Sequence, residues 1–112
     1  MDDDSMGGGI MAKERDLQAK FLSELRKAGY KCFKQQMNAT TRIGTPDCII
    51  CYKKFYGFCE FKKSKDASFR PGQKEVLEEL GKWTYARVVF PENFDIIMSE
   101  LIEVKKNEDM QN

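Results

Sequence analysis

Residues 47 to 62, DCIICYKKFYGFCEFK, contain two largely apolar stretches separated by the polar pair Lys53-Lys54. Short runs rich in isoleucine and aromatic residues, divided by a brief polar break, predict two strands joined by a turn. Asp47 lies six residues before Lys53, and Glu60 lies six residues after Lys54. A hairpin that turns at the two lysines therefore sets Asp47 and Glu60 almost opposite each other at its open end.

The motif Glu60-Phe61-Lys62 places an acid and a base on one face of the second strand, because side chains alternate between the two faces. Phe61 then points into the core. Two adjacent carboxylates repel and are costly to bury, and a divalent cation removes that cost. Carboxylate oxygens suit magnesium or manganese, and a lysine ammonium can stabilise charge that builds on a phosphate. This pattern indicates phosphodiester hydrolysis; a charged strand edge with a salt bridge is the alternative.

The flanking sequence completes an α/β domain with a central mixed sheet covered by helices. The predicted order is α-β-β-β-α-β-α. The elements are a helix over 12–28, a strand over 30–36, a loop over 38–45, strands over 47–52 and 55–63, a basic loop over 64–70, a helix from Pro71, a strand over 85–90 and a helix from Pro91. We expect one domain over 12–103, a disordered segment over 1–11 and a flexible tail over 104–112.

The composition is that of a globular protein of 112 residues with a net charge of +1. It has no apolar run long enough to cross a bilayer and no visible secretory signal, so we expect a cytoplasmic protein. Cys48 and Cys51 form a C-x-x-C motif, which raises the alternative of a zinc or redox site. On a strand these two side chains point to opposite faces, and the chain has no histidine, so buried apolar cysteines are favoured.

Positive charge is concentrated in residues 53 to 74, where seven basic residues face only Glu60 and Asp66. Such a segment predicts a surface that binds a polyanion, with an ordinary solvated lysine-rich surface as the alternative. The residues expected to contact phosphates lie near the proposed acid pair in the sequence or by strand pairing: Arg42, Lys53, Lys54, Lys63, Lys65 and Arg70. No helix has the pattern of a recognition helix, which favours recognition of the nucleic-acid backbone over readout of bases.

Gly44-Thr45-Pro46-Asp47, Glu60-Phe61-Lys62 and Gln73 together resemble the signature of the PD-(D/E)XK nuclease superfamily, and in particular its VRR-NUC family of virus-type replication-repair nucleases. The resemblance covers residues 13 to 101, about the whole predicted domain. The stretches Arg70-Pro71-Gly72-Gln73 and Arg87-Val88-Val89-Phe90-Pro91 make it more specific than the catalytic signature alone. It implies a restriction-endonuclease-like core.

The resemblance also implies the site: catalytic residues Asp47, Glu60, Lys62 and Gln73, and Mg²⁺, replaceable by Mn²⁺, bound by Asp47, Glu60 and an acid of the first helix. Glu14 is the matching position for that acid, and Asp16 is the competing candidate. We favour Glu14 because its helical face carries Gln18 and not the apolar stripe.

Standalone, phage-type members of the resembled family act as homodimers on branched DNA such as Holliday junctions. The expected function is therefore a homodimeric, magnesium-dependent endonuclease selective for branched DNA, located in the host cytoplasm if phage-encoded. Two alternatives remain. One is a nicking or restriction-like enzyme that cuts ordinary duplex DNA. The other is a catalytically inactive DNA-binding module, against which the intact Asp47, Glu60 and Lys62 set argues.

Overall fold

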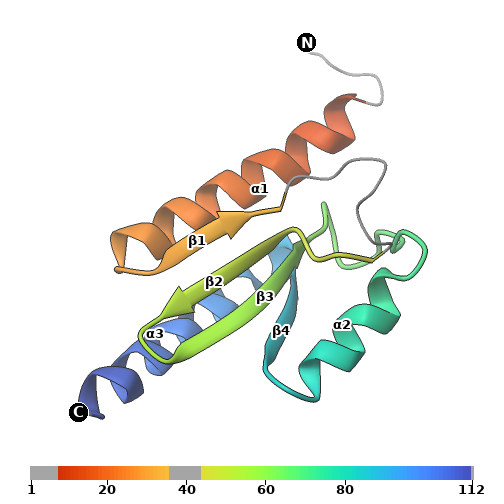
Figure 1. Cartoon of the computed structure of the whole chain (residues 1–112). Helices are drawn as coiled ribbons and strands as arrows, with labels where there is room; N and C mark the ends of the chain where they lie inside the picture. Colours follow the sequence, from red (N-terminus) through yellow and green to blue (C-terminus); the bar gives the residue numbers. More distant parts are fainter. Residues whose placement is uncertain (1–7, 36–43, 112) are drawn as a thin grey trace.

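The computed structural model describes residues 8–35 and 44–111 (Figure 1). The elements, in chain order, are α1 (Gly8–Lys27), β1 (Lys31–Lys34), β2 (Cys48–Tyr52), β3 (Phe55–Phe61), α2 (Gln73–Gly81), β4 (Tyr85–Val89), the 3-10 helix η1 (Pro91–Asn93) and α3 (Phe94–Met110). Apart from the short η1, this confirms the predicted order α-β-β-β-α-β-α. The predicted loop over 38–45 lies largely outside the described residues.

The four strands form one mixed sheet in the order β1-β2-β3-β4. The first three are antiparallel, and β4 runs parallel to β3. In the β2–β3 hairpin, Cys48 pairs with Cys59 and Tyr52 pairs with Phe55, so the chain turns at Lys53 and Lys54. Lys53 adopts a left-handed conformation with φ of 54°, as a two-residue hairpin turn requires. The register predicted from the sequence is confirmed.

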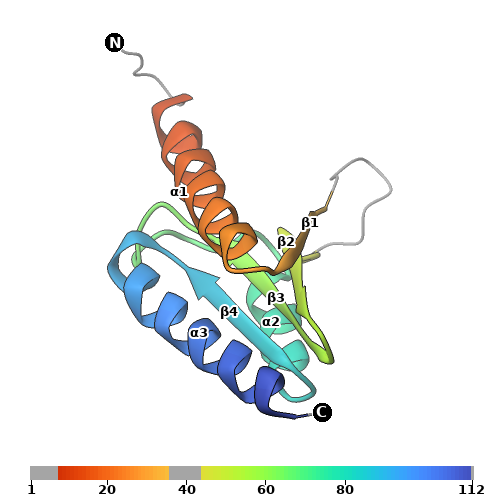
Figure 2. The same ribbon diagram turned by 90° about the vertical axis from the view of Figure 1, so that its left-hand side faces the viewer.

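Helices α1 and α3 cover one face of the sheet, and α2 lies on the other (Figure 2). Phe21 of α1 packs against both the sheet and α3. The centre of its ring lies 5.5 Å from that of Phe61 in β3 and 5.6 Å from that of Phe94 in α3, both edge to face. The buried phenol of Tyr30 donates a hydrogen bond of 2.6 Å to the carbonyl of Leu101 and so ties the end of α1 to α3. This apolar layer supports the strands that carry the site.

The outer face of β3 changes character along the strand. Tyr56 is half exposed, but Glu60 on the same face is fully buried. The change occurs because α2 covers the end of the sheet at which Glu60 lies and brings the buried Gln73 against it. The structure thus buries a carboxylate on a sheet face that is open to solvent further along.

The first helix begins at Gly8, earlier than the predicted residue 12. Residues 8–11 extend α1 because adding residues to a formed helix is much cheaper than nucleating one. The second helix, in contrast, begins at Gln73 and not at Pro71. Gly72 stands between them with a φ of 82°, a left-handed conformation that cannot belong to the helix.

The predicted flexible tail over 104–112 is wrong for residues 104–110, which continue α3 to Met110. The end of α3 is held by the β2–β3 turn. Tyr52 and Lys53 both contact Asp109 at 2.7 Å, and the backbone N–H of Lys54 donates a hydrogen bond of 3.0 Å to Glu108. These polar contacts leave no periodic apolar signal in the sequence, so the pattern alone does not reveal them. Within the described ranges, no helix is long and apolar enough to span a membrane.

Candidate functional site

Asp47 and Glu60 lie side by side where β2 begins and β3 ends. The backbone N–H of Asp47 donates a hydrogen bond of 3.1 Å to Oε1 of Glu60. The backbone N–H of Phe61 donates one of 2.8 Å to Oδ2 of Asp47. Each carboxylate is therefore fixed by the opposite segment of the hairpin. The predicted approach of the two acids is what the register of β2 and β3 produces.

Burial, and after it the neighbouring charge of Asp47, together raise the pKa of Glu60 to about 7. Lys62 and Arg70 act in the opposite direction but do not cancel these effects. Placing negative charge on both carboxylates is thus costly in the fold as it stands. A further cation beside the pair would lower that cost, because it favours the ionised form of each carboxyl group.

Gln73 connects the charged residues of the site through its buried side-chain amide. Its Nε2 donates a hydrogen bond to Oε2 of Glu60. Its Oε1 accepts two bonds of 2.7 Å, one from Nζ of Lys62 and one from the backbone N–H of Arg70. Only this orientation of the amide pairs every donor with an acceptor. Gln73 therefore fixes the positions of an acid and a base at once.

Lys62 is nearly buried, with 5% of its surface exposed. Besides the bond to Gln73, its Nζ lies 3.9 Å from Oε2 of Glu60 and 5.3 Å from the centre of the Phe69 ring. Glu60 and Lys62 thus share one side of the sheet, as the spacing predicts. Because Lys62 also lines the cleft, its ammonium group is placed to interact with a negatively charged group that binds there.

Arg70 reaches both acids from the segment between β3 and α2. Its Nη2 lies 3.3 Å from Oε2 of Glu60 and 3.6 Å from Oδ1 of Asp47. More than half of its side chain is exposed. The sequence predicts a phosphate contact for this residue but gives no sign of the double ion pair, which depends on how the segment folds back over the sheet.

A cleft of about 320 Å³ opens at this end of the molecule, between α1 and the segment that precedes α2. Its lining consists of Glu14, Arg15, Gln18, Asp47, Lys62, Ser68 and Arg70. Glu14 is half-buried in this lining, whereas Asp16 is exposed and is not part of it, which favours Glu14 as the acid of the first helix. The sequence analysis did not predict Arg15 and Ser68 as part of the site. Arg15 directly follows Glu14 in the sequence, which is the one signal that could have indicated it, and no comparable signal exists for Ser68.

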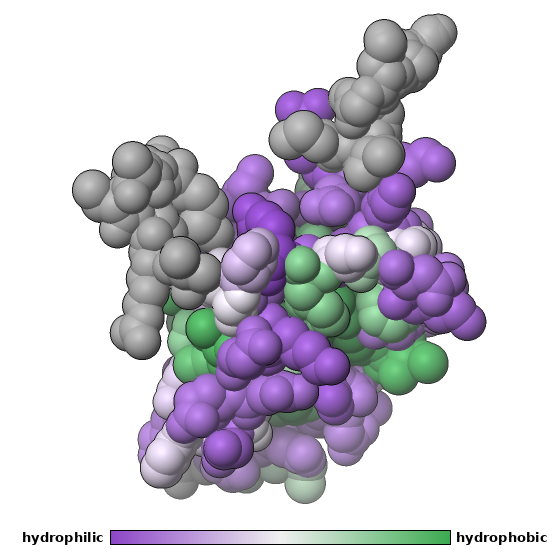
Figure 3. Space-filling model, turned by 90° about the vertical axis from the view of Figure 1, so that its right-hand side faces the viewer, coloured by the Kyte–Doolittle hydropathy of each residue, from purple (hydrophilic) through white to green (hydrophobic). Residues whose placement is uncertain are grey.

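The surface near this end is largely hydrophilic, with smaller apolar areas between the polar groups (Figure 3). Lys63 is half-buried and Lys65 exposed, both on the segment that carries Arg70. Lys53 and Lys54, however, lie at the turn, at the other end of β2 and about 20 Å from Asp47. The expectation that these two lysines lie near the site is wrong, since an antiparallel hairpin places its turn as far as possible from its open end. Arg42 lies outside the described residues.

The donor set at the acid pair fits a magnesium ion. No three carboxylate or thiol groups of the described residues converge closely enough to form a complete metal site. Magnesium does not require one, because it keeps several waters and is commonly held by one or two carboxylates together with phosphate oxygens. Asp47 and Glu60 would supply the two carboxylates, and Glu14 lines the same cleft as Asp47.

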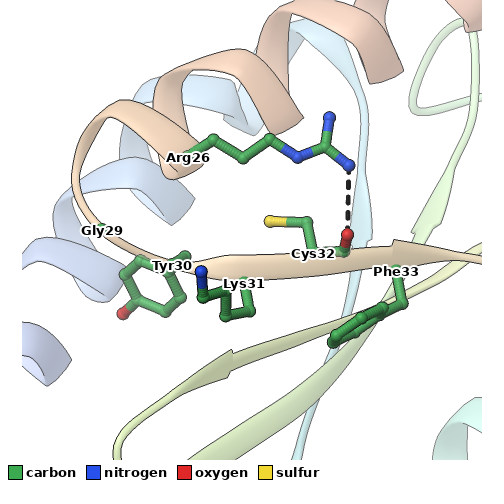
Figure 4. A pocket seen from close by; sticks show the side chains of 6 residues that line it. All are labelled: Arg26, Gly29, Tyr30, Lys31, Cys32 and Phe33. Carbon is green, nitrogen blue, oxygen red and sulfur yellow. Dashed lines mark hydrogen bonds between the residues drawn. The ribbon is translucent and has the colours of Figure 1, made fainter.

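Two other features of the sequence fall outside this arrangement. Cys48 is buried in the core, and Cys51 lies on the opposite side of the sheet, where it pairs with Lys31 and Tyr56. A second pocket of about 320 Å³ lies along the edge of β1, where the guanidinium of Arg26 donates a hydrogen bond of 3.1 Å to the carbonyl of Cys32 (Figure 4). Its lining contains no carboxylate. Neither feature offers the ligands of a hard divalent cation.

A mixed sheet with helices on both faces, with an acid pair and a lysine at one end, defines an α/β domain of the restriction-endonuclease-like type. A solved structure described as "VRR_NUC domain" superimposes on this chain with a TM-score of 0.65 and 21% sequence identity, covering 78% of this chain and 95% of that one. At this identity the likeness shows a shared fold, and it confirms the predicted fold. No family model and no curated protein matches the sequence.

Proposed function

We propose that this protein is a metal-dependent DNA endonuclease. The observation that carries the proposal is that Asp47 and Lys62 line one cleft while Glu60 lies buried directly beside them, with both carboxylates held by backbone N–H groups. A phosphodiester hydrolase needs carboxylates for a divalent ion and a cationic group near the reacting phosphate. The likeness to a structure described as "VRR_NUC domain" supports the same reaction class.

In this proposal Asp47 and Glu60 hold Mg²⁺, and Glu14 completes the ligand set from α1. Mn²⁺ is expected to substitute, because it prefers similar oxygen ligands. When bound, the ion polarises the phosphate and lowers the pKa of a coordinated water. Glu60 must be ionised to serve as a ligand, so its raised pKa predicts weak metal binding below about pH 7.

Lys62 donates a hydrogen bond either to the attacking water or to a phosphate oxygen on which negative charge accumulates. Its ammonium group suits this role because it is nearly buried, where electrostatic interactions are stronger than in water. Gln73 acts as a positioning residue, since it binds both Lys62 and Glu60. Arg15, Lys63 and Lys65 extend the positive surface beside the cleft along which a DNA backbone would lie.

The proposed substrate is branched DNA such as a four-way junction, cut by a homodimer. One such site cuts one strand, so symmetric cleavage of two strands requires two copies, and a twofold dimer is the commonest arrangement. Recognition would depend on the shape and backbone of the DNA, because no helix has the sequence pattern of a recognition helix.

The test is a cleavage assay with Mg²⁺ and with Mn²⁺ on four-way junctions, flaps and linear duplexes. We expect Asp47→Asn to abolish cleavage and Lys62→Ala to reduce its rate by about 10² to 10³-fold while junction binding persists. Lys82→Ala is the matched control, because Lys82 is an exposed lysine beyond α2 and its change should leave the rate unaltered.

The outcomes separate the candidate functions. Preferential cleavage of junctions supports the proposal, whereas equal or faster cleavage of linear duplex supports a nicking or restriction-like enzyme. A parent protein that binds DNA but cuts none of these substrates with either metal would be a DNA-binding module. Sedimentation of the protein with and without a junction tests the dimer separately.

A further inference from the structure

Arg70 contacts the two oxygens of the acid pair that the backbone of the hairpin does not use. The hairpin N–H groups bind Oε1 of Glu60 and Oδ2 of Asp47. The guanidinium instead approaches Oε2 of Glu60 at 3.3 Å and Oδ1 of Asp47 at 3.6 Å. The partners of these two oxygens are side chains, namely Arg70 at both and also Gln73 at Oε2 of Glu60, so that side-chain movement alone can free them for a metal ion.

The backbone and the side chain of Arg70 are held very differently. Its backbone is fixed by Gln73, whose N–H donates a 3.1 Å hydrogen bond to the Arg70 carbonyl and whose Oε1 accepts a 2.7 Å bond from the Arg70 N–H. Its side chain is 59% exposed. The guanidinium can therefore leave the carboxylates by rotation about side-chain bonds, without any change in the segment that carries it.

Lys62 does not have this freedom. Its side chain is only 7% exposed and its Nζ remains bonded to Gln73, at 3.9 Å from the nearest oxygen of Glu60. Between Lys62 and Arg70, it is thus Arg70 that a metal ion would displace, because like charges repel and Arg70 bridges both carboxylates whereas Lys62 approaches Glu60.

We propose that Arg70 is a resident counter-ion of Asp47 and Glu60, and that a divalent cation binds the acid pair only by displacing its guanidinium. The inference rests on the proposed function, because it assumes that the metal binds at this pair. It assigns Arg70 a role in metal binding beyond the phosphate contact expected from the sequence. Arg70 balances part of the negative charge of the pair in the metal-free protein and lowers the affinity of the pair for the ion.

The test is a Mn²⁺ titration of the full-length protein without DNA, with free Mn²⁺ measured by electron paramagnetic resonance at pH 8. We expect Arg70→Gln to bind Mn²⁺ about three- to tenfold more tightly than the parent, since two half-exposed ion pairs no longer compete. Arg70→Lys should lie between them, because a single ammonium cannot bridge both carboxylates as a guanidinium does. Lys82→Gln removes one exposed positive charge beyond the end of α2 and should change the affinity less than twofold.

Asp47→Asn separates the two proposals. If this variant loses the Mn²⁺ site and Arg70→Gln binds no more tightly than the parent, the counter-ion role is overturned and the metal site stands. If Asp47→Asn binds Mn²⁺ as the parent does, the ion is not on the acid pair, and both proposals fail. Circular dichroism establishes that each variant is folded. If Arg70→Gln does not fold, Arg70→Lys replaces it as the test, and an Arg70→Lys variant that binds Mn²⁺ no more tightly than the parent overturns the inference.

Discussion

Asp47 donates its backbone N–H to the side chain of Glu60 over 3.1 Å, just beyond the last paired residues of the hairpin. The bond continues the connection between the two segments past the strands themselves. The two like charges are consequently held together by the backbone, whose geometry follows from the hairpin register. Their mutual repulsion lowers the stability of the folded protein when both are ionised, and it raises the pKa of Glu60.

The stability of the protein should fall as pH rises towards 7. The folded pKa of Glu60 is about 7, against an ordinary value of 4.5, so the folded chain keeps a proton that the unfolded chain has already released. Between these values the unfolding free energy decreases with pH, by at most about 1.4 kcal/mol per pH unit for one group. The contribution is fully present below pH 4.5 and is lost as pH rises through 7.

Asp47→Asn should make this decline shallower, because it removes the neighbouring charge that helps to raise the pKa of Glu60. Urea unfolding at pH 5, 6, 7 and 8 measures the effect. Asp66→Asn is the control, since Asp66 is an exposed acid on the segment after β3. A parental slope in Asp47→Asn would contradict the assignment of the coupling to this pair.

Gln73→Met should destabilise the protein by about 2 to 4 kcal/mol. The change keeps the volume but leaves Oε2 of Glu60, Nζ of Lys62 and the backbone N–H of Arg70 without their buried partner. Lys74→Met, one residue further on α2 and exposed, should change stability by about 0.5 kcal/mol or less. Equal effects of the two substitutions in chemical denaturation would show that the amide does not bind these groups.

Substitution of two glycines by alanine should change the stability of the protein in opposite directions. Gly44 has a φ of 87°, and a Cβ there would lie 2.6 Å from the carbonyl oxygen of Gly72, so Gly44→Ala should lower stability by more than about 1 kcal/mol. Gly81→Ala, at the end of α2 with open space around it, should raise stability by about 0.5 to 1 kcal/mol. Thermal unfolding of both variants tests the pair, and a tolerated Gly44→Ala would argue against the close approach to Gly72.

The salt dependence of DNA binding should identify the face that contacts phosphates. Lys63→Gln and Lys65→Gln together should reduce the slope of log affinity against log salt by about two, because each removes one counterion-releasing contact. The same changes at Lys53 and Lys54 should leave the slope unaltered, since these residues lie at the far end of the hairpin, against α3. The reverse result would place the DNA along the turn and away from the cleft.

The sequence was sufficient to predict the sheet and the acid pair because both follow from local rules. Alternation of side chains sets Glu60 and Lys62 on one face, and the two-residue turn fixes the register that brings Asp47 to Glu60. The helix and strand order follows in the same way from apolar periodicity. These features depend on residues close to one another in the chain.

What the sequence could not predict depends on contacts between distant segments. The helical end of α3 is stabilised by Asp109 and Glu108, which bind the β2–β3 turn more than fifty residues earlier in the chain. The position of Arg70 over both carboxylates follows from the path of an irregular segment, for which no periodic pattern exists. Lys53 and Lys54 are close to the site residues in the sequence, which led to the prediction that they lie near the site. The hairpin instead places them at its turn, at the opposite end from Asp47 and Glu60.

The hydrogen bonds that assemble the site join residues only 3 to 14 positions apart. Closing such short loops costs little chain entropy compared with docking α1 and α3 across the sheet. Local contacts of this kind form readily on the way to the native state, whereas the outer helices supply most of the burial that makes it persist. Substitutions among the apolar residues of α1 or α3 would accordingly change the rate of unfolding far more than the geometry of the acid pair.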